Sequence, residues 1–471
     1  MADPVLRVVL YKRHLGDLTQ SREGGERRLR YRAGETATAL SLSMPVAGVA
    51  YGRRQVEPFL LGLLPDSPVA LTALGRRFDV SGRNPFALLQ HVGLDCAGAV
   101  QFARTEDLEL ALSSTGELEP LDEQGIGARL RRLREQPGDW IATGEHWSLA
   151  GAQEKFALRR VDERWFSPSG AEPTTHIIKP GIAGLRAQAL NEHLCLDALR
   201  RAGLRAVRSE YVEFDAEPAI VVERYDRRQQ SDGTVLRIHQ EDLCQSLSVY
   251  PQHKYESEGG PTATQIVSLL RASNATPDSI DRFVDALAAN YLLGAPDAHA
   301  KNYSVLLVGD RVELAPLYDV ASSFPYEAER RSSLRRVSMK IGGENEFGRI
   351  EGRHWRRFAE RAALDPDAVR SRVRELATIL PDALRDAITA AGPAASELGG
   401  RLLAPVADNC RAALGSLVAD RTSSISVDPG TDESPPPSGD DAEVSGGGRW
   451  VEPHTRSGRP VDGYWRSLPG G

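Results

Sequence analysis

One stretch of the chain, from Thr276 to Asp319, constrains the possible folds more than any other segment. Thr276-Pro277 predicts the start of a helix, and apolar residues at helical spacing follow it as far as Gly294, a typical helix-ending residue. Two apolar runs then flank Gly309-Asp310, which predicts a tight β-hairpin. The segment between helix and hairpin is therefore held at both ends by regular structure.

The predicted hairpin brings two side chains together at its open end. With a two-residue turn, Asn302 faces Leu317, and Asp319 lies just beyond the strand end beside Asn302. An amide oxygen and a carboxylate are hard ligands of the kind that magnesium prefers, with waters and phosphates in the remaining positions. A turn aspartate without a ligand is the other interpretation of Asp319.

The loop before the hairpin, Asp297-Ala-His-Ala-Lys-Asn302, carries the polar groups that phosphoryl transfer requires. One carboxylate must accept a hydroxyl proton, one amide oxygen must hold a magnesium ion, and cations must lie near the developing negative charge. Protein kinases keep the same interval between a catalytic Asp and a metal-binding Asn. The same residues also suit a polar turn between helix and strand with no catalytic role.

Upstream segments supply the other parts of a phosphotransferase in the order in which a kinase uses them. Small residues in Ala150–Lys155 let backbone N–H groups approach phosphate oxygens, although the loop lacks G-x-G-x-x-G. A predicted strand ends at Lys179, and Glu192 follows in a predicted helix, as in the lysine–glutamate pair of kinases. Backbone groups of Glu223 and Tyr225, at the end of a later strand, suit an adenine edge. Each segment by itself is also explained as an average turn, a surface lysine or the last strand of a sheet.

Composition excludes several classes of protein. The chain has 471 residues, 41% hydrophobic and 26% charged, which predicts two or three globular units. A net charge of −7 argues against direct coating of nucleic acid. The four cysteines are scattered, which indicates buried thiols and no zinc site or disulfide framework. Without a signal-peptide pattern or a run of ~18 apolar residues, we expect a soluble, cytoplasmic protein.

We expect an α+β fold. Residues 1–115 form a β-rich subdomain, with a strand at Leu6–Tyr11, a turn at Gly16-Asp17 and a second strand at Leu108–Leu112. A connector (116–145) leads to a lobe of short strands (146–260) and a helical lobe (261–422).

The end of the chain, residues 423–471, differs from the rest. Asp428–Glu443 is acidic and rich in proline, so it cannot bury enough apolar surface to order. The Arg- and Trp-rich peptide Arg449–Arg466 that follows suits either a docking motif or a tail without a binding role.

Six motifs, some of them described above, are recognisable in chain order: Leu63-Leu-Pro-Asp-Ser-Pro68, Ser148-Leu-Ala-Gly-Ala-Gln-Glu-Lys155, Thr174-Thr-His-Ile-Ile-Lys179, Glu241-Asp-Leu-Cys-Gln245, Lys254-Tyr-Glu-Ser-Glu-Gly-Gly-Pro261 and Asp297-Ala-His-Ala-Lys-Asn302. In this order they resemble the HipA toxin kinases of bacterial toxin–antitoxin systems. The resemblance covers roughly residues 5–420 and leaves the tail unexplained. It implies a β-rich N-terminal subdomain followed by a two-lobed protein-kinase-like core.

The resemblance also implies a serine/threonine protein kinase that uses ATP and magnesium. Its catalytic residues would be Asp297 as proton acceptor, with His299 and Lys301, and its magnesium ligands Asn302 and Asp319. Residues on ATP would be Ala150, Gly151, Ala152, Gln153, Glu154, Lys155, Lys179, Glu223, Arg224, Tyr225, His299, Asn302, Tyr318 and Asp319. Ser148 matches the serine that family members phosphorylate on themselves, which stops activity by displacing the phosphate loop.

The partners implied by the resemblance are a small helix-turn-helix antitoxin, HipB-like, and operator DNA bound only through it. The substrate would be a protein of translation, notably glutamyl-tRNA synthetase, whose phosphorylation arrests growth and favours persistence.

Two other functions compete with this one. A small-molecule phosphotransferase of the aminoglycoside-kinase kind shares the Asp-to-Asn interval, but it needs an acidic acceptor pocket, and no such cluster is evident. A non-catalytic partner of an antitoxin would have lost a catalytic or metal-binding residue, yet Asp297, Asn302, Asp319 and Lys179 are all present.

Overall fold

The structure, a computed structural model, describes residues 3–22, 25–32, 34, 38–136, 141, 145–329, 332–423, 448–451, 454–456, 459–461 and 464–467. The chain divides into two units, Met1–Ser423 and Ser424–Gly471, which are described separately. None of the helices in the described part of the chain is long and apolar enough to cross a bilayer.

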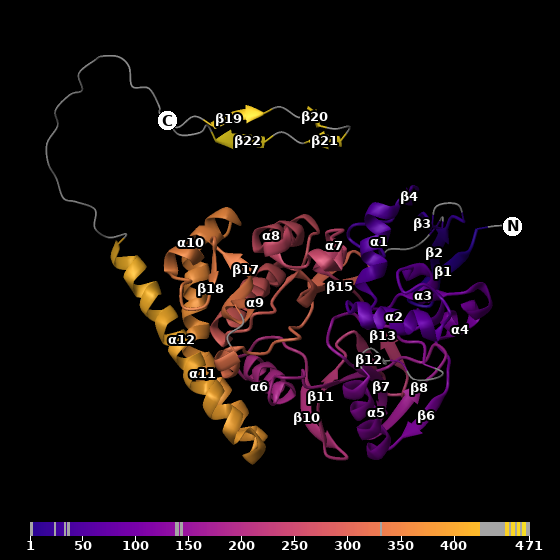
Figure 1. Ribbon diagram of the computed structural model, residues 1–471, viewed down its shortest axis with the longest axis horizontal. Coiled ribbons are helices and arrows are strands. Elements are labelled where there is room, and N and C mark those ends of the chain that lie inside the picture. Colours follow the sequence, from indigo (N-terminus) through magenta and orange to yellow (C-terminus); the bar gives the residue numbers. More distant parts are fainter. Residues whose placement is uncertain are drawn as a thin grey trace. The chain divides into compact units, whose positions relative to one another are not determined.

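The first unit begins with a five-stranded antiparallel sheet (Figure 1). Its strand order is β4 (Ala50–Tyr51), β3 (Arg27–Tyr31), β2 (Arg13–Gln20), β1 (Val5–Leu10), β5 (Gln101–Ala103). Four helices accompany this sheet: α1 (Arg53–Gly62), α2 (Pro68–Arg77), α3 (Pro85–Val92) and α4 (Leu108–Ser113).

The turn expected at Gly16-Asp17 lies elsewhere. The chain reverses at Tyr11 and Lys12, whose φ angles of 51° and 59° are left-handed. Gly16 lies inside β2, where a Cβ would come within 2.4 Å of the carbonyl oxygen of Arg30 on β3. Close approach of two strands therefore explains this glycine, and the prediction of a turn there was wrong.

The strand expected at Leu108–Leu112 is helix α4 instead. In a run of five residues, alternation and helical spacing overlap, because Leu108, Ala111 and Leu112 are also spaced i, i+3, i+4. These three side chains pack in a small apolar cluster with Val9 of β1. Tertiary packing thus selects the helical period.

A six-stranded antiparallel sheet follows, in the order β10-β11-β9-β7-β8-β6; most of its strands are labelled in Figure 1. Two helices, α5 and α6, pack against it. The segment 116–145, predicted as a connector, contributes edge strand β6 and helix α5. The bounds are β6 (Leu118–Leu121), α5 (Glu123–Glu135), β7 (Phe156–Val161), β8 (Arg164–Pro168), β9 (His176–Pro180), α6 (Gln188–Arg201), β10 (Ser209–Phe214) and β11 (Glu217–Glu223).

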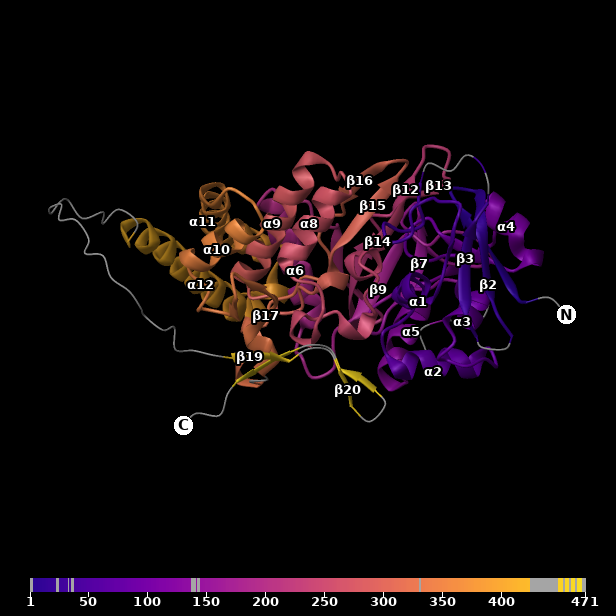
Figure 2. The ribbon, with the colours of Figure 1, turned by 90° about the horizontal axis from the view of Figure 1, so that it is seen from above.

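The remainder of the first unit contains short strands up to residue 242 and is largely helical from 261 to 422, the range predicted to be helical. Its helices are α7 (Leu243–Ser246), α8 (Ala263–Ala272), α9 (Pro277–Leu293), α10 (Gly352–Arg361), α11 (Pro366–Ala391) and α12 (Ser396–Ser423). The strands among them are β12 (Arg227–Gln229), β13 (Val235–Arg237), β14 (His239–Asp242), β15 (Ser304–Val308), β16 (Arg311–Leu314), β17 (Arg336–Ile341) and β18 (Glu344–Glu346). Within this unit, the N-terminal sheet lies at one end and α11 and α12 at the other (Figure 1, Figure 2).

The predicted hairpin is confirmed over most of its length. β15 and β16 pair Val308 with Arg311 around a turn at Gly309, and the ladder extends back to a bond from the Ala315 N–H to the Ser304 carbonyl. Beyond that point the strands separate. Leu317 pairs with Ala206, so the predicted pairing of Leu317 with Asn302 was wrong.

In the second unit, β19 (Gly448–Val451) pairs with β22 (Tyr464–Ser467), and β20 (His454–Arg456) with β21 (Arg459–Val461). Of the tail predicted to be disordered, 423–471, Ser423 belongs to α12 and the residues just named form strands, whereas the others lie outside the described residues.

Candidate active site

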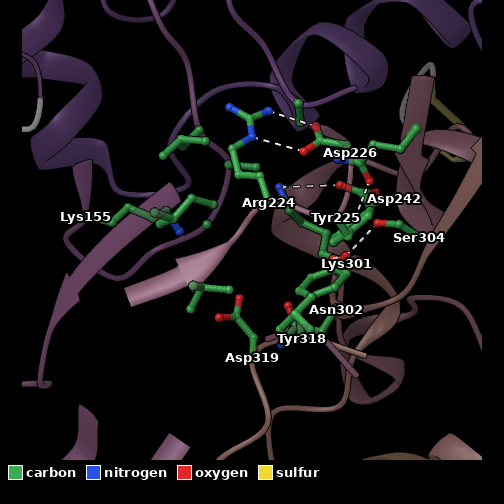
Figure 3. A pocket seen from close by; sticks show the side chains of 18 of the residues that line it. Lys155, Arg224, Tyr225, Asp226, Asp242, Lys301, Asn302, Ser304, Tyr318 and Asp319 are labelled. Atoms are coloured by element: carbon green, nitrogen blue, oxygen red, sulfur yellow. Dashed lines mark hydrogen bonds and ion pairs between the residues drawn. The ribbon is translucent and has the colours of Figure 1, made fainter. Parts of the chain in front are cut away.

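Two cavities, of about 130 and 660 Å³, adjoin where the six-stranded sheet meets the helical part. Six residues line both cavities: Gly151, Lys155, Glu192, Lys301, Asn302 and Asp319. Each residue predicted to be catalytic, to bind ATP or to bind magnesium lines at least one of the two cavities. Figure 3 shows Asp319, Asn302 and Tyr318 at one end of a pocket, with Arg224 and Asp226 at the other.

At the smaller cavity, Lys179 links strand β9 to helix α6 and to the loop that carries Asp319. Its ammonium, near the end of β9, lies 2.9 Å from Glu192 Oε1 on α6 and also contacts Asp319 Oδ1. Burial alone would lower the pKa of Lys179, but the two carboxylates raise it above its usual value. Burial would likewise raise the pKa of Asp319, but Lys179 and Lys155 hold it at about 2. Both partners are therefore charged at neutral pH.

The loop before β7 borders both cavities. Gly151 adopts a φ of +106°, and a Cβ there would lie 2.5 Å from the Lys155 ammonium. Burial lowers the pKa of Lys155 to about 8, with Asp319 opposing the effect and Lys179 adding to it. Gln153 fastens the loop to β9 by donating to the Pro180 carbonyl at 2.8 Å.

The predicted catalytic loop begins where α9 ends at Gly294, whose φ is 68°. Asp297 is exposed, and its Oδ1 accepts a hydrogen bond of 2.7 Å from the Tyr255 hydroxyl. Asn302 Nδ2 donates to the Asp297 carbonyl at 2.6 Å. This bond engages the amide nitrogen of Asn302 and leaves its oxygen as the atom that can bind a cation.

His299 is buried beside Asp297, with Nε2 at 3.6 Å from Asp297 Oδ1. Within the described residues, neither ring nitrogen has a hydrogen-bond partner. Burial lowers the pKa of His299 to about 4. The imidazole is therefore neutral at pH 7, and the positive charge of this loop comes from Lys301 alone.

Lys301 is held by residues that sequence reasoning did not assign to the site. Its ammonium lies 2.8 Å from Asp66 Oδ1 and 3.8 Å from Asp242 Oδ2, and Asp66 Oδ2 lies 3.0 Å from Lys254 Nζ. Asp66 and Lys254 belong to two of the recognised motifs, but no spacing within either motif indicates that they meet. Tyr255, the partner of Asp297, was missed for the same reason.

Part of the wall of the smaller cavity is aromatic. Tyr225 stacks on Tyr318 with ring centroids 5.6 Å apart, and the Tyr318 hydroxyl donates to the Lys301 carbonyl at 2.9 Å. Arg224, expected on ATP, directs its guanidinium to Asp226 at 2.8 Å (Figure 3). It can therefore offer a ligand its backbone groups but not its charge.

Ser148 is the one predicted residue that lines neither cavity. It is 1% exposed, and its hydroxyl donates to the Leu63 carbonyl at 2.7 Å.

The donor set fits magnesium better than a transition metal. Across the described residues, no group of three or more His, Cys, Asp or Glu could hold a metal ion. Asn302 and Asp319 instead offer two hard oxygens beside one cavity, and Mg²⁺ is usually held by one or two protein groups plus phosphates and waters.

Comparison with known proteins identifies the family. The model of the HipA N-terminal domain matches residues 6–103, and that of the HipA-like C-terminal domain matches residues 147–384. The chain belongs to the HipA family. Similar proteins include the "putative kinase Y4mE" of Sinorhizobium fredii, 36% identical over 345 residues, which cover 73% of this chain and 81% of that protein.

The serine/threonine-protein kinase toxin HipA of Shewanella oneidensis is 28% identical over 368 residues, covering 74% of this chain and 81% of that protein. Among solved structures, the complex of HipA, HipB and operator DNA from Shewanella oneidensis MR-1 contains a similar chain, with a TM-score of 0.77 and 25% identity. That likeness covers 88% of this chain and 99% of the other. The predicted family, the α+β fold with a kinase-like core and the serine/threonine-kinase class are thereby confirmed.

Proposed function

We propose that this HipA-family kinase is the toxin of a toxin–antitoxin pair, which transfers the γ-phosphate of ATP to hydroxyl groups of proteins, its own Ser148 among them. The observation that carries the proposal is the position of Lys179, which contacts both Glu192 and Asp319 beside the cavity that Asn302 also lines. Protein kinases require this combination of strand lysine, helix glutamate and metal-binding aspartate.

ATP would lie across the two cavities. The adenine fits the smaller one, beside the Tyr225–Tyr318 stack and the backbone of Glu223. The phosphates would extend past Lys179 and Lys155 toward the larger cavity. Magnesium held by Asn302 and Asp319 would neutralise negative charge on the phosphates.

Asp297 would accept the proton. In the reaction, the acceptor oxygen bonds to the γ-phosphorus, the bond to the ADP oxygen breaks, and the hydroxyl proton moves to the Asp297 carboxylate. Asp297 is exposed at the larger cavity, where a protein hydroxyl can approach, and the Tyr255 hydroxyl orients its carboxylate. Lys301, with its charge maintained by Asp66 and Asp242, would stabilise the charge that develops on the phosphoryl oxygens.

Phosphorylation of Ser148 would switch the enzyme off. The Ser148 hydroxyl is buried against the Leu63 carbonyl, so it can enter an active site only when its loop leaves this position. A phosphate of about −2 charge cannot return to a buried position whose partner is a carbonyl oxygen. The modified loop, which includes Gly151, would therefore remain displaced from the ATP site.

The proposed partner is a HipB-like helix-turn-helix antitoxin, through which the chain would reach operator DNA. Support comes from the likeness to the HipA chain of a HipA–HipB–DNA complex, together with a net charge of −7 that disfavours DNA binding by the chain alone. The proposed substrate is a translation protein such as glutamyl-tRNA synthetase, and the proposed location is the cytoplasm.

Intact-mass measurement tests the kinase proposal. Purified protein incubated with ATP and magnesium should gain the mass of one phosphate, and peptide mapping should place it on Ser148. Asp297→Asn should abolish the gain, and Ser148→Ala should remove it while leaving nucleotide binding intact. If the wild-type protein gains no mass, the proposal of a self-phosphorylating protein kinase is refuted, and consumption of ATP with added small hydroxyl compounds would then favour the small-molecule phosphotransferase.

A further inference from the structure

The N-terminal part of the chain contributes one carboxylate, that of Asp66, to the lining of the candidate active site. Asp66 lies between α1 and α2, far along the chain from the kinase motifs, yet it lines the larger cavity together with Asp297. Its side chain is 10% exposed. Both oxygens are engaged, Oδ1 by Lys301 at 2.8 Å and Oδ2 by Lys254 at 3.0 Å.

The backbone of Asp66 reaches the phosphate loop as well. Its N–H donates to the Gly151 carbonyl at 2.9 Å, and the preceding Pro65 forms a bridge with Gly151. Lys254 precedes Tyr255, which donates to Asp297. Asp66 therefore contacts the phosphate loop, the catalytic loop and the segment that orients the candidate base.

The negative charge of Asp66 offsets the repulsion between two neighbouring lysines. Lys301 and Lys254 would repel each other if the carboxylate between them were absent. Burial would raise the pKa of Asp66, but these two ammonium groups hold it at about 2, so it is ionised at any pH at which the protein works. One shared anion fixes two cations on the cavity wall beside Asp297.

We infer that Asp66 is a positioning residue for phosphoryl transfer, which holds the ammonium groups of Lys301 and Lys254 beside the reacting phosphate. The N-terminal domain thereby completes the kinase site and does more than cover the core. This inference rests on the proposed kinase activity. A residue that only docked the phosphate loop would have the opposite effect on self-phosphorylation, because its loss would release Ser148.

The experiment compares full-length wild type with Asp66→Asn, which keeps the size of the side chain and the backbone bond to Gly151. The initial rate of Ser148 phosphorylation is measured at saturating ATP and magnesium, and binding of a non-hydrolysable ATP analogue is measured separately. We expect Asp66→Asn to lower the maximal rate ~30- to 100-fold, since small misplacements of reacting groups have effects of this order. Binding of the analogue should change by less than ~threefold, because a loss confined to the reaction step lowers kcat and not affinity.

A double-mutant comparison with Lys301 distinguishes a positioning role of Asp66 from a general loss of stability. In a Lys301→Met background, Asp66→Asn should lower the rate by less than ~threefold further, because its target is already gone. The matched control is Glu57→Gln, an equally conservative change in the same domain. Glu57 is half-buried in an ion pair with Arg27 and lines neither cavity, so its variant should keep the wild-type rate.

Each result decides the inference. An unchanged or higher rate for Asp66→Asn, or equal effects in the wild-type and Lys301→Met backgrounds, overturns it while leaving the kinase proposal intact. If melting shows that Asp66→Asn is unfolded, Asp66→Glu decides instead, because it keeps the charge but displaces the carboxylate by one methylene group. A rate equal to that of wild type then overturns positioning, whereas a partial loss in a folded protein supports it. No phosphorylation by the wild type overturns both proposals together.

Discussion

Lys179 and Glu192 form a buried ion pair, with Nζ 2.9 Å from Oε1, that joins strand β9 to helix α6 at the rim of the smaller cavity. Asp319 competes for the same ammonium. Glu192 therefore holds Lys179 beside the cavity, where its ammonium also contacts Asp319.

Replacing Glu192 tests this role. In Glu192→Gln, Lys179 keeps Asp319 as its one carboxylate partner and moves toward it, so we expect the KM for ATP to rise about tenfold. The measurement is the self-phosphorylation rate as a function of ATP concentration. Asp197→Asn is the control, because Asp197 lies on the same helix in an exposed pair with Arg201. An unchanged KM in Glu192→Gln would contradict the assignment of Lys179 to ATP.

Gly151→Ala should weaken nucleotide binding. An alanine at a φ of +106° is strained, and its Cβ would press on the Lys155 ammonium 2.5 Å away. We expect an about tenfold loss in affinity for an ATP analogue, measured by calorimetry. Gly203→Ala serves as the control, because Gly203 has a φ of +83° but no atom within 4 Å of the added Cβ. If both variants bind the analogue equally well, the close approach of loop and lysine has no role in binding.

Lys155 should make ATP binding depend on pH. Burial places its pKa in the free protein at about 8, below its ordinary value, so the ammonium is present below that pH and is lost as the pH rises through it. Affinity for the ATP analogue should therefore fall between pH 7 and 9, by about tenfold, the loss expected for one charge-assisted contact. Lys155→Arg, which stays charged throughout, should show a flatter profile. Equal slopes for the two proteins would assign the pH dependence to another group.

Glu241 should make stability depend on pH. It is fully buried on β14, and burial raises its pKa to about 7 even though Oε1 accepts a 2.8 Å bond from the Leu42 N–H. Because the folded pKa is the higher one, its contribution to stability is complete below about pH 4.5 and is lost as the pH rises through 7.

The loss amounts to roughly 3 kcal/mol for a shift of this size. Glu241→Gln cannot ionise, so its free energy of unfolding should exceed that of the wild type by more at pH 8 than at pH 5. Urea unfolding at the two pH values measures the difference. Parallel changes in wild type and variant would show that Glu241 does not control this dependence.

Local patterns in the sequence predicted the elements whose structure depends on near neighbours. Helix α9, from Pro277 to Leu293, follows from its apolar spacing and terminal residues, and the β15–β16 turn follows from Gly309-Asp310. The same patterns failed where two periods overlap, at Leu108–Leu112, and where a glycine permits strand contact without forming a turn, at Gly16.

Some residues of the candidate site could likewise be predicted from local sequence patterns, and others could not. Chain order and spacing suggested that Lys179, Glu192, Asn302 and Asp319 belong to one site, and all four line the smaller cavity. Asp66, Lys254 and Tyr255 could not be found in this way. Asp66 and Lys301 are 235 residues apart, and local spacing carries no information about such a pair.

By itself, then, the sequence determined the inventory of chemical groups, the helices and strands that carry them, and the resemblance to one kinase family. The tertiary structure decided which charges are paired, that His299 is neutral, that Ser148 is buried, and that an N-terminal carboxylate pairs with Lys301. The physical reason is that propensity and periodicity act over a few residues, whereas burial and ion pairing depend on segments that meet only when the whole chain has packed.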